Sequence, residues 1–218
     1  ADWQAGDLLE VLPGNHAEAP VREYSIASLP AAGVLALLVR QERHPDGSLG
    51  LGSGWLTDGA ALQQPLLARL RRNSGFHAPE ADCPLILIGN GTGLAGLRSL
   101  LKQRIGAGHL RNWLLFGERN AAHDFYCREE LGGWQASGEL ARLDLAFSRD
   151  QAAKLYVQDR LRMAAEHLRN WVAEGAAIYV CGSLDGMAGG VDEVLREVLG
   201  AAQVEALIEA GRYRRDVY

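Results

Sequence analysis

The chain has 218 residues, of which 48% are hydrophobic and 22% are charged. This is an ordinary globular composition with enough apolar material for a sizeable core. The net charge is -5, and the basic residues are scattered apart from short runs at 69–72 and 212–215. This distribution is not typical of a nucleic-acid-binding protein, although a mildly acidic surface can still carry a local basic pocket for a phosphate.

Three cysteines without paired spacing argue against a disulfide framework or a zinc cluster, and they favour a reducing compartment. We therefore expect no metal site. No apolar run approaches the roughly 20 residues of a membrane span, and no signal peptide opens the chain. We expect no membrane contact by this segment itself and a cytoplasmic location, either as such or as the cytoplasmic domain of a larger membrane-anchored chain.

The first 80 residues contain short β-type runs at 8–12, 21–27 and 34–41, separated by turns that carry proline or glycine. Such runs predict antiparallel β structure, part of a barrel or a sandwich. The segment 57–72 then has the pattern of a helix.

After residue 80 the pattern changes to alternating strands and helices, which predicts a doubly wound parallel sheet with right-handed crossovers. A continuous apolar run at 85–88 ends in Gly89, as expected for a buried parallel strand. Ligands bind such sheets at the carboxyl ends of the strands. Further strands are expected at 113–116, 143–147, 177–180 and, as an edge strand, 213–218; helices are expected after Gly89 and at 156–172, 187–199 and 203–210.

A glycine-rich loop, residues 89–96, follows the first parallel strand. Glycines let the backbone approach a pyrophosphate, and the N-terminus of the next helix favours its charge. Gly91, Gly93 and Gly96 have the spacing G-x-G-x-x-G, and Glu118 after the second strand is placed like the ribose-binding acid of an NAD site. A lone motif of this kind is a weak signal, and a tight turn without a ligand is the alternative.

Polar side chains follow the third strand, at Ser148, Arg149, Lys154 and Tyr156. Two cations, a hydroxyl and an aromatic ring suit an adenosine 2′-phosphate. The alternative is a solvated helix start, and the neighbouring glycine loop favours the phosphate.

Two features near the C-terminus are also candidates for a functional site. Cys181 stands at the end of the fourth strand beside Gly182, where a cysteine either packs or takes part in chemistry. The chain then ends in Asp216-Val217-Tyr218. An acid two residues before a terminal aromatic suggests a ring that lies over a flat cofactor.

The β portion contains a second candidate site. Arg22 and Tyr24 share one face of a strand by period-two alternation, whereas Ser25 faces the other way unless a bend redirects it. A second glycine and serine loop at 50–56 precedes the expected helix and again suits a pyrophosphate. Two such loops suggest two dinucleotides, although glycine-rich turns are common in a chain with 26 glycines.

In combination, these motifs resemble the ferredoxin–NADP reductase module that ends diflavin reductases, and they are most similar to the flavoprotein subunit of NADPH-dependent sulfite reductase. The resemblance covers essentially the whole chain. It implies an FAD-binding domain at 1–80 and an NADP-binding domain at 81–218 with a flavin-stacking tail. It also implies an NADPH-dependent, FAD-containing oxidoreductase that transfers hydride from NADPH to FAD and delivers electrons to an acceptor protein or a fused flavodoxin-like domain.

The same resemblance implies roles for individual residues. Arg22 would bind the FAD pyrophosphate, Tyr24 would lie along the flavin, and Ser25 would bond near its N5 atom. The remaining expected FAD ligands are Gly50, Gly52 and Ser53. The expected NADPH ligands are Gly91, Thr92, Gly93, Ser148, Arg149, Lys154 and Tyr156. Ser25, Cys181 and Asp216 would flank the hydride path, and Tyr218 would shield the flavin face.

The chain departs from the family pattern at several points. Asn90 and Gly96 stand where prolines are usual, a short link at 13–20 replaces a helical insertion, and barrel strands expected before Trp3 are missing. We therefore expect a minimal module with an N-terminally truncated, partial barrel, cut from a longer protein. The alternative is a flavin-free NADP(H)-binding sensor or docking module, and flavin colour in the purified protein distinguishes the two.

Overall fold

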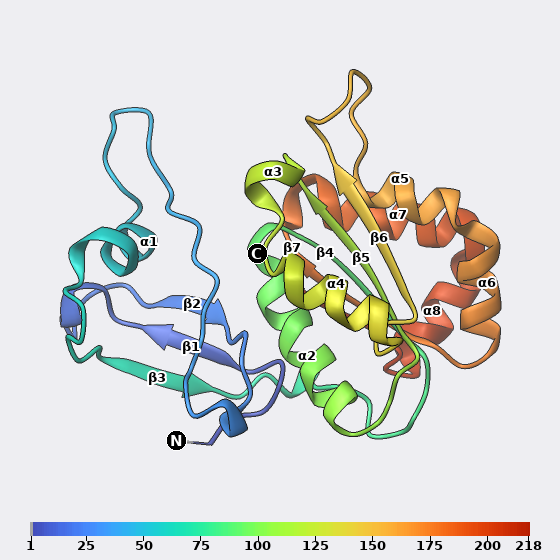
Figure 1. The fold of residues 1–218 in the computed structure, drawn as a ribbon, viewed down its shortest axis with the longest axis horizontal. Coiled ribbons are helices and arrows are strands. Elements are labelled where there is room, and N and C mark those ends of the chain that lie inside the picture. The colour runs from blue at the N-terminus through green and yellow to red at the C-terminus, as the bar shows by residue number, and fades with distance from the viewer. Residues whose placement is uncertain (1) are drawn as a thin grey trace.

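The computed structural model describes residues 2–218 and places a small antiparallel sheet beside a larger α/β unit (Figure 1). The small sheet has the order β2-β1-β3, formed by β1 (Leu8–Val11), β2 (Arg22–Ser25) and β3 (Ala68–Arg71). Both pairings are antiparallel. The antiparallel β structure expected from the sequence is thus confirmed, while Ala1 of the expected first domain lies outside the described residues.

The helix expected at 57–72 is wrong. The short helix α1 (Leu51–Gly54) runs into a single π-turn (Trp55–Gly59), and the chain then extends into β3. Pro65 disfavours a helix here because it lacks an N–H donor and restricts its neighbours. β3 pairs with β1 instead, so tertiary pairing overrides the helix-like pattern.

The strand expected at 34–41 is also wrong. Only one isolated bridge forms there, between Leu37 and Ile26. The rest of this segment runs between the small sheet and the α/β unit without regular structure (Figure 1).

The larger sheet is parallel throughout, in the order β6-β5-β4-β7-β8. This confirms the doubly wound sheet, including its last edge strand. The strands are β4 (Leu85–Asn90), β5 (Asn112–Glu118), β6 (Arg142–Phe147), β7 (Ala177–Gly182) and β8 (Tyr213–Val217).

Helices cover both faces of this sheet (Figure 1). They are α2 (Leu94–Gly106), α3 (Ala121–Asp124), α4 (Arg128–Ser137), α5 (Val157–Met163), α6 (Ala165–Ala173), α7 (Gly189–Leu199) and α8 (Ala201–Glu209). Single-turn 3₁₀ helices occur at Pro13–Asn15, Pro30–Ala32, Ser74–Phe76 and Gly91–Gly93, and a π-turn at Leu184–Ala188. The single helix expected at 156–172 is wrong, because Ala164 (φ -96°, ψ 23°) separates α5 from α6 without a proline or glycine to mark the break.

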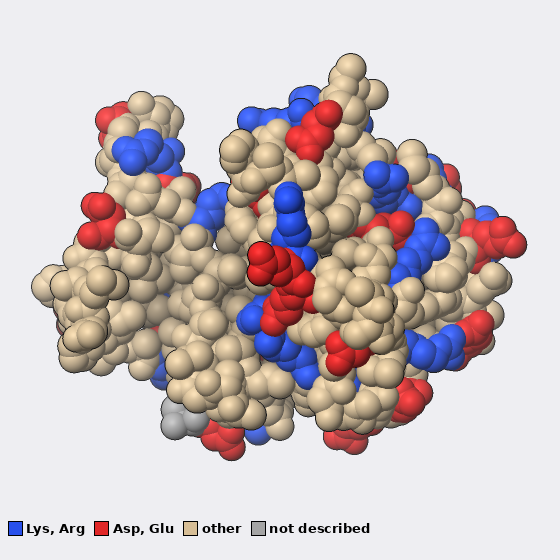
Figure 2. Space-filling model, in the orientation of Figure 1, with Lys and Arg blue, Asp and Glu red and all other residues tan. Residues whose placement is uncertain are grey.

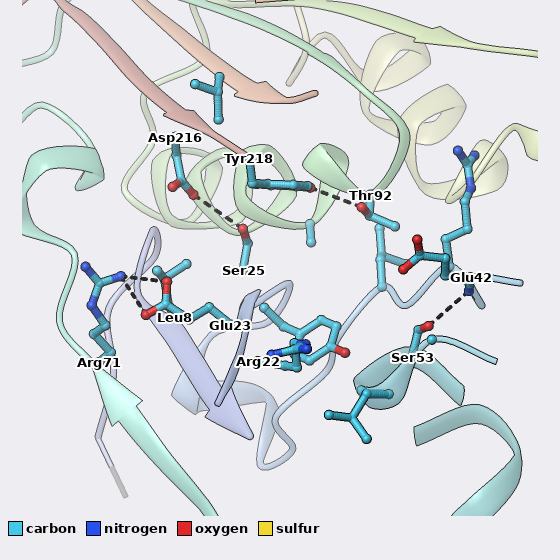
Figure 3. A pocket seen from close by; sticks show the side chains of 18 of the residues that line it. Leu8, Arg22, Glu23, Ser25, Glu42, Ser53, Arg71, Thr92, Asp216 and Tyr218 are labelled. Atoms are coloured by element: carbon cyan, nitrogen blue, oxygen red, sulfur yellow. Dashed lines mark hydrogen bonds and ion pairs between the residues drawn. The ribbon is translucent and has the colours of Figure 1, made fainter. Parts of the chain in front are cut away.

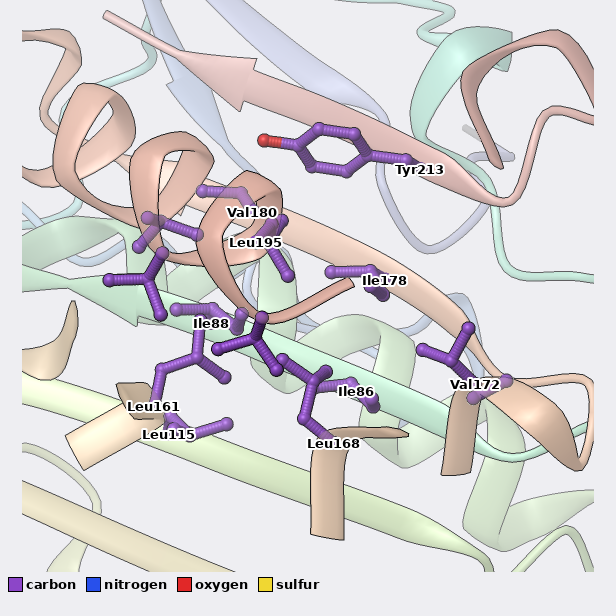
Figure 4. Close-up of a cluster of buried hydrophobic side chains, with 14 of the residues drawn as sticks. Ile86, Ile88, Leu115, Leu161, Leu168, Val172, Ile178, Val180, Leu195 and Tyr213 are labelled. Atoms are coloured by element: carbon purple, nitrogen blue, oxygen red, sulfur yellow. The ribbon is translucent and has the colours of Figure 1, made fainter. Parts of the chain in front are cut away.

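Alternate residues of the strands enter two separate cores. Ile86 and Ile88 pack with α5–α8 in the cluster shown in Figure 4, whereas Leu85 and Leu87 pack against α2 on the opposite face. All four side chains are fully buried. Burial on both faces makes the sheet a firm platform for the side chains at its carboxyl edge.

Several contacts fasten the small sheet to this platform. The Asp7 carboxylate accepts a hydrogen bond from the Asn73 amide at 2.9 Å and contacts His77 Nε2 at 2.6 Å. Tyr179 of β7 donates its hydroxyl hydrogen bond to the His77 carbonyl at 2.7 Å. On the other side, the Arg98 guanidinium of α2 donates to the Ala27 carbonyl. These contacts fix the space between the two sheets.

Over residues 2–218, no helix combines the length and the apolar character that crossing a membrane requires. Within the same range, no cluster of three or more His, Cys, Asp or Glu side chains could hold a metal ion.

Candidate active site between the two sheets

A cavity of about 680 Å³ lies between the small sheet and the carboxyl edge of the large one (Figure 3). Its volume falls within the range of roughly 300–1,000 Å³ that is usual for small-molecule sites. We call it the first cavity. Its lining includes Arg22, Tyr24, Ser25, Gly50, Gly52, Ser53, Thr92, Asp216 and Tyr218.

Three residues that are far apart in sequence meet on one side of this cavity. The Ser25 hydroxyl, at the end of β2, donates to Asp216 Oδ2 at 3.4 Å. The Cys181 thiol donates to the same oxygen at 3.9 Å, because β7 and β8 pair Cys181 with Asp216. The structure thus brings together the three residues expected to flank a hydride path.

Burial shifts the pKa values of two of these three side chains, Asp216 and Cys181. Burial raises the pKa of the Asp216 carboxyl, and the Ser25 hydrogen bond partly opposes that shift. Burial, with the neighbouring Asp216 carboxylate, raises the pKa of the Cys181 thiol well above its ordinary value. Cys181 is therefore a neutral thiol at neutral pH, unlike a reactive cysteine.

Cys181 also has a packing role. Its side chain is fully buried and is not part of the cavity lining. A Cβ atom at Gly93 would lie 2.2 Å from the Cys181 carbonyl oxygen, so only glycine fits where the loop crosses β7. Close packing against β7 is therefore sufficient to explain why glycine stands at position 93, whether or not the loop binds a ligand.

Tyr218 is held in two ways. Its backbone continues the edge pairing, because its amide donates to the Gly182 carbonyl at 3.1 Å and its carbonyl accepts from the Leu184 amide at 2.9 Å. Its side-chain hydroxyl lies 3.0 Å from Thr92 Oγ1 (Figure 3), and the residue remains 61% exposed. The ring thus has a fixed base and a single polar contact at its tip.

Arg22 and Tyr24 lie against the backbone of α1. A Cβ atom at Gly52 would lie 2.6 Å from the Tyr24 hydroxyl and 2.7 Å from Arg22 Cγ, so glycine permits this close approach. The Arg22 guanidinium donates to the carbonyls of Pro20 and Val21. Among residues 2–218 no carboxylate forms an ion pair with it, which leaves its charge available to an anionic ligand.

Ser53 lies in α1, next to Gly52. Its Oγ accepts a hydrogen bond from the Glu42 amide at 3.0 Å, so its hydroxyl hydrogen stays available as a donor. The sequence predicts a loop before a long helix here, whereas the structure forms a four-residue helix within the loop itself.

A second cavity of about 480 Å³ opens at the carboxyl ends of β5 and β6. Ser148 and Tyr156 line it, as the sequence predicts, whereas Arg149 and Lys154 lie on the exposed part of the loop between them. Asn90, Glu118, Arg119 and Gln158 line it as well. Two sizeable cavities therefore lie next to the glycine loop, the first lined by Thr92 and the second by Asn90.

Three arginines that line these cavities, Arg40, Arg71 and Arg119, were not among the residues predicted from the sequence. Arg119 directly follows Glu118 at a strand end, so its position could have identified it. Its carbonyl accepts from the Arg149 amide at 2.8 Å, which places the two residues side by side. Arg40 lines both cavities but belongs to an irregular segment, so no sequence pattern marks it.

Positive and negative side chains are interspersed over the face shown in Figure 2, with no extended field of one sign. A phosphate ligand would therefore be attracted by individual side chains in the cavities and not by a broad basic surface on this face.

Residues 87–193 match the family described as "Oxidoreductase NAD-binding domain". This segment, just under half of the chain, belongs to that family. The matched range contains both the glycine loop and the second cavity. The doubly wound nucleotide-binding fold and the oxidoreductase class expected from the sequence are confirmed.

Similar proteins carry the expected name. The chain is 39% identical over 214 residues to the "Sulfite reductase [NADPH] flavoprotein alpha-component" of Yersinia enterocolitica, covering 90% of this chain and 36% of that protein. The protein of the same name from Neisseria meningitidis is 38% identical over 214 residues, with 90% and 35% covered. The resemblance inferred from the motifs is confirmed, and the chain spans about a third of the length of these relatives. The printed name of these relatives contains NADPH and describes a flavoprotein.

Proposed function

We propose that this chain is a module that transfers hydride from NADPH to FAD and passes the electrons to a separate acceptor. The observation that carries the proposal is the position of Ser25, Asp216 and Tyr218. They line the first cavity, which the glycine loop also lines through Thr92. Residues 1–80 would form the FAD-binding domain and residues 81–218 the NADP-binding domain.

The first cavity suits FAD. Arg22 would pair with its pyrophosphate together with the α1 backbone at Gly50 and Gly52, Tyr24 would lie along the flavin, and the Ser53 hydroxyl would donate to a phosphate oxygen. FAD, when bound, accepts the hydride and can release its electrons one at a time. The protein's own contribution is to hold and orient both cofactors and to supply the local charge.

The second cavity suits the phosphorylated end of NADPH. Ser148 and Tyr156 line it, and Arg149 and Lys154 extend from the same loop, so a rotation of their side chains would bring their charges to a 2′-phosphate. We assign the loop Gly91, Thr92 and Gly93 to the path between the cavities, towards the nicotinamide. Charge-assisted hydrogen bonds to phosphate are among the stronger polar contacts in proteins.

Asp216 and its two partners would act where positive charge develops on the nicotinamide. An ionised Asp216 stabilises that charge, and Ser25 holds the carboxylate in place through its hydroxyl hydrogen bond. Cys181 would act through Asp216, since its thiol contacts the same oxygen from the buried side.

Tyr218 would be a displaceable lid. Its ring lines the first cavity and its only side-chain hydrogen bond among residues 2–218 is to Thr92. A ring in this position competes with a nicotinamide for the same space, so nicotinamide binding requires the loss of one hydrogen bond and of the ring's contacts. This competition would weaken unproductive, overly tight nicotinamide binding.

The partner of the module is proposed by its chemistry. A one-electron acceptor is required, either as a separate protein or as a fused flavodoxin-like domain. Three free cysteines accord with a reducing, cytoplasmic setting.

Flavin retention tests the proposal. The purified protein is incubated with FAD, desalted and examined for flavin absorbance, with Arg22→Ala as the matched variant. We expect stoichiometric flavin in the unmodified protein and weaker retention in the variant. Undetectable flavin in both, with retained NADP+ binding, would instead support a flavin-free NADP(H)-binding sensor or docking module.

A further inference from the structure

Arg40 occupies a distinctive place in the site, because it lines both cavities. Its guanidinium forms an ion pair with Glu118 at the end of β5 and donates to the Tyr126 hydroxyl at 3.0 Å. Its pKa is raised by its Tyr126 and Glu118 partners, against the opposing effect of burial, so it stays charged.

The neighbouring segment anchors Arg40 from the other side. The Gln41 side chain donates to Thr57 Oγ1 at 2.9 Å, and the Glu42 amide donates to Ser53 Oγ at 3.0 Å. Residues 41–42 are thus fixed to α1 and to the turn that follows it, and the Arg40 side chain extends from this segment to the parallel sheet. Its position over Glu118 is held from both directions.

Glu118 requires such a partner. Its side chain is only 3% exposed, whereas that of Arg40 is 39% exposed. The other carboxylate oxygen accepts from the Arg119 amide at 2.7 Å. A buried carboxylate without a cation is costly, so loss of Arg40 would leave an uncompensated negative charge in the wall of the second cavity.

That charge would lie beside the proposed phosphate site. Glu118 and Ser148 line the same cavity, and the Ser148 amide donates to the Glu118 carbonyl at 2.8 Å. A Cβ atom at Gly91 would lie 3.4 Å from Glu118 Oε1, which also places the carboxylate beside the glycine loop. A free acid after the second strand suits ribose hydroxyls and repels a phosphate dianion.

We propose that Arg40 masks Glu118 and thereby makes the second cavity selective for a 2′-phosphorylated nicotinamide dinucleotide over the unphosphorylated one. Arg40 is in this sense a specificity-determining residue contributed by the flavin side of the molecule. The inference rests on the proposed assignment of the second cavity to NADP.

Calorimetric titration with NADP+ and with NAD+ at pH 8 tests this inference. The proteins are the unmodified chain, Arg40→Ala, Arg40→Lys, Glu118→Gln and the double variant Arg40→Ala/Glu118→Gln. We expect Arg40→Ala to lower the ratio of NADP+ to NAD+ affinity by about tenfold, the effect of one charged contact. Glu118→Gln should keep the original ratio, Arg40→Lys should keep most of it, and the double variant should restore it.

Other results would overturn the inference. An equal loss of affinity for both nucleotides in Arg40→Ala, or a double variant as impaired as Arg40→Ala, would mean that Arg40 binds phosphate directly or only supports the fold. A loss of selectivity in Glu118→Gln would mean that the ion pair acts as a structural fastening. The double variant leaves no unpaired charge at this position, so it keeps the test decisive if Arg40→Ala alone does not fold. Failure of the unmodified chain to bind NADP+ would instead sink the proposed function.

Discussion

The hydroxyl of Tyr218 lies 3.0 Å from Oγ1 of Thr92, which joins the end of β8 to the glycine loop across the mouth of the first cavity. The tail is thus attached to the element that we assign to the path of the nicotinamide. Two variants separate the contributions of the ring and of its hydrogen bond.

Removal of the ring in Tyr218→Ala should raise affinity for NADP+ and for NAD+, because no aromatic ring then competes for the nicotinamide position. The preference for NADPH over NADH in turnover should fall, because tighter nicotinamide binding slows the release of NADP+, which its phosphate already retains, whereas NADH gains the affinity that it lacks. Steady-state reduction of ferricyanide with each cofactor, together with charge-transfer absorbance, measures both effects.

Tyr218→Phe is the matched control, because it keeps the ring and removes only the hydroxyl. It should lie close to the unmodified protein, with a shift of about 1 kcal/mol or less in nucleotide binding free energy, as for one neutral hydrogen bond. The lid hypothesis would be wrong if Tyr218→Ala left the preference and the charge-transfer absorbance unchanged.

Asp216→Asn should slow hydride transfer by about 10- to 100-fold, the lower part of the range for losing a preorganised electrostatic contact. The amide retains the shape and the Ser25 hydrogen bond but cannot stabilise positive charge. Rapid-mixing measurement of flavin bleaching reports this step directly, and Ser25→Ala should show a smaller effect. An Asn variant with an unchanged bleaching rate would exclude the proposed role of the carboxylate.

The same substitution has a consequence for stability. Burial raises the pKa of Asp216 above its ordinary value of 3.8. At a pH between the pKa of the unfolded state and that of the folded state, the folded protein therefore binds more protons than the unfolded protein. The contribution of Asp216 to the free energy of unfolding therefore falls as pH rises through that window. Urea denaturation between about pH 4 and pH 7 should show this slope reduced in Asp216→Asn. An identical slope in both proteins would argue against the raised pKa.

Cation substitutions test the phosphate assignment. Arg149→Ala and Lys154→Ala should each weaken NADP+ binding by about tenfold or more while changing NAD+ binding little, because a charge-assisted contact to the 2′-phosphate is lost. Calorimetric titration measures both nucleotides. Equal effects on NADP+ and NAD+ would favour a site in which Glu118 serves the ribose of NAD.

Thiol labelling checks the buried position of Cys181. Its raised pKa and full burial keep the thiol neutral and covered, so iodoacetamide should modify the partly exposed Cys83 first and leave Cys181 intact until the protein unfolds. Mass spectrometry of the digested protein locates the label. Early modification of Cys181 would show that the contact with Asp216 opens readily.

The sequence predicts the parallel sheet well, because its strands are continuous apolar runs that are buried on both faces. It also predicts where the functional side chains converge, since carboxyl ends of parallel strands share one edge. Cys181 and Asp216 meet there, whereas Ser25 comes from the antiparallel sheet, 191 positions from Asp216, and only the family resemblance predicts its place beside them.

Other features depend on contacts that no local pattern records. Residues 68–71 form β3 because β1 offers a partner, and Arg40 reaches the site only because an irregular segment crosses between the two sheets. Glu118 shows the limit most directly. Its position after a strand suggests a free ribose ligand, whereas the structure pairs it with Arg40.

Anaerobic mixing of the FAD-loaded protein with NADPH tests the central claim most directly. We expect a rapid loss of flavin absorbance with NADPH, and a much slower loss with NADH at equal concentration. Flavin that stays oxidised in the presence of bound NADPH, or that is bleached equally fast by both cofactors, would contradict it.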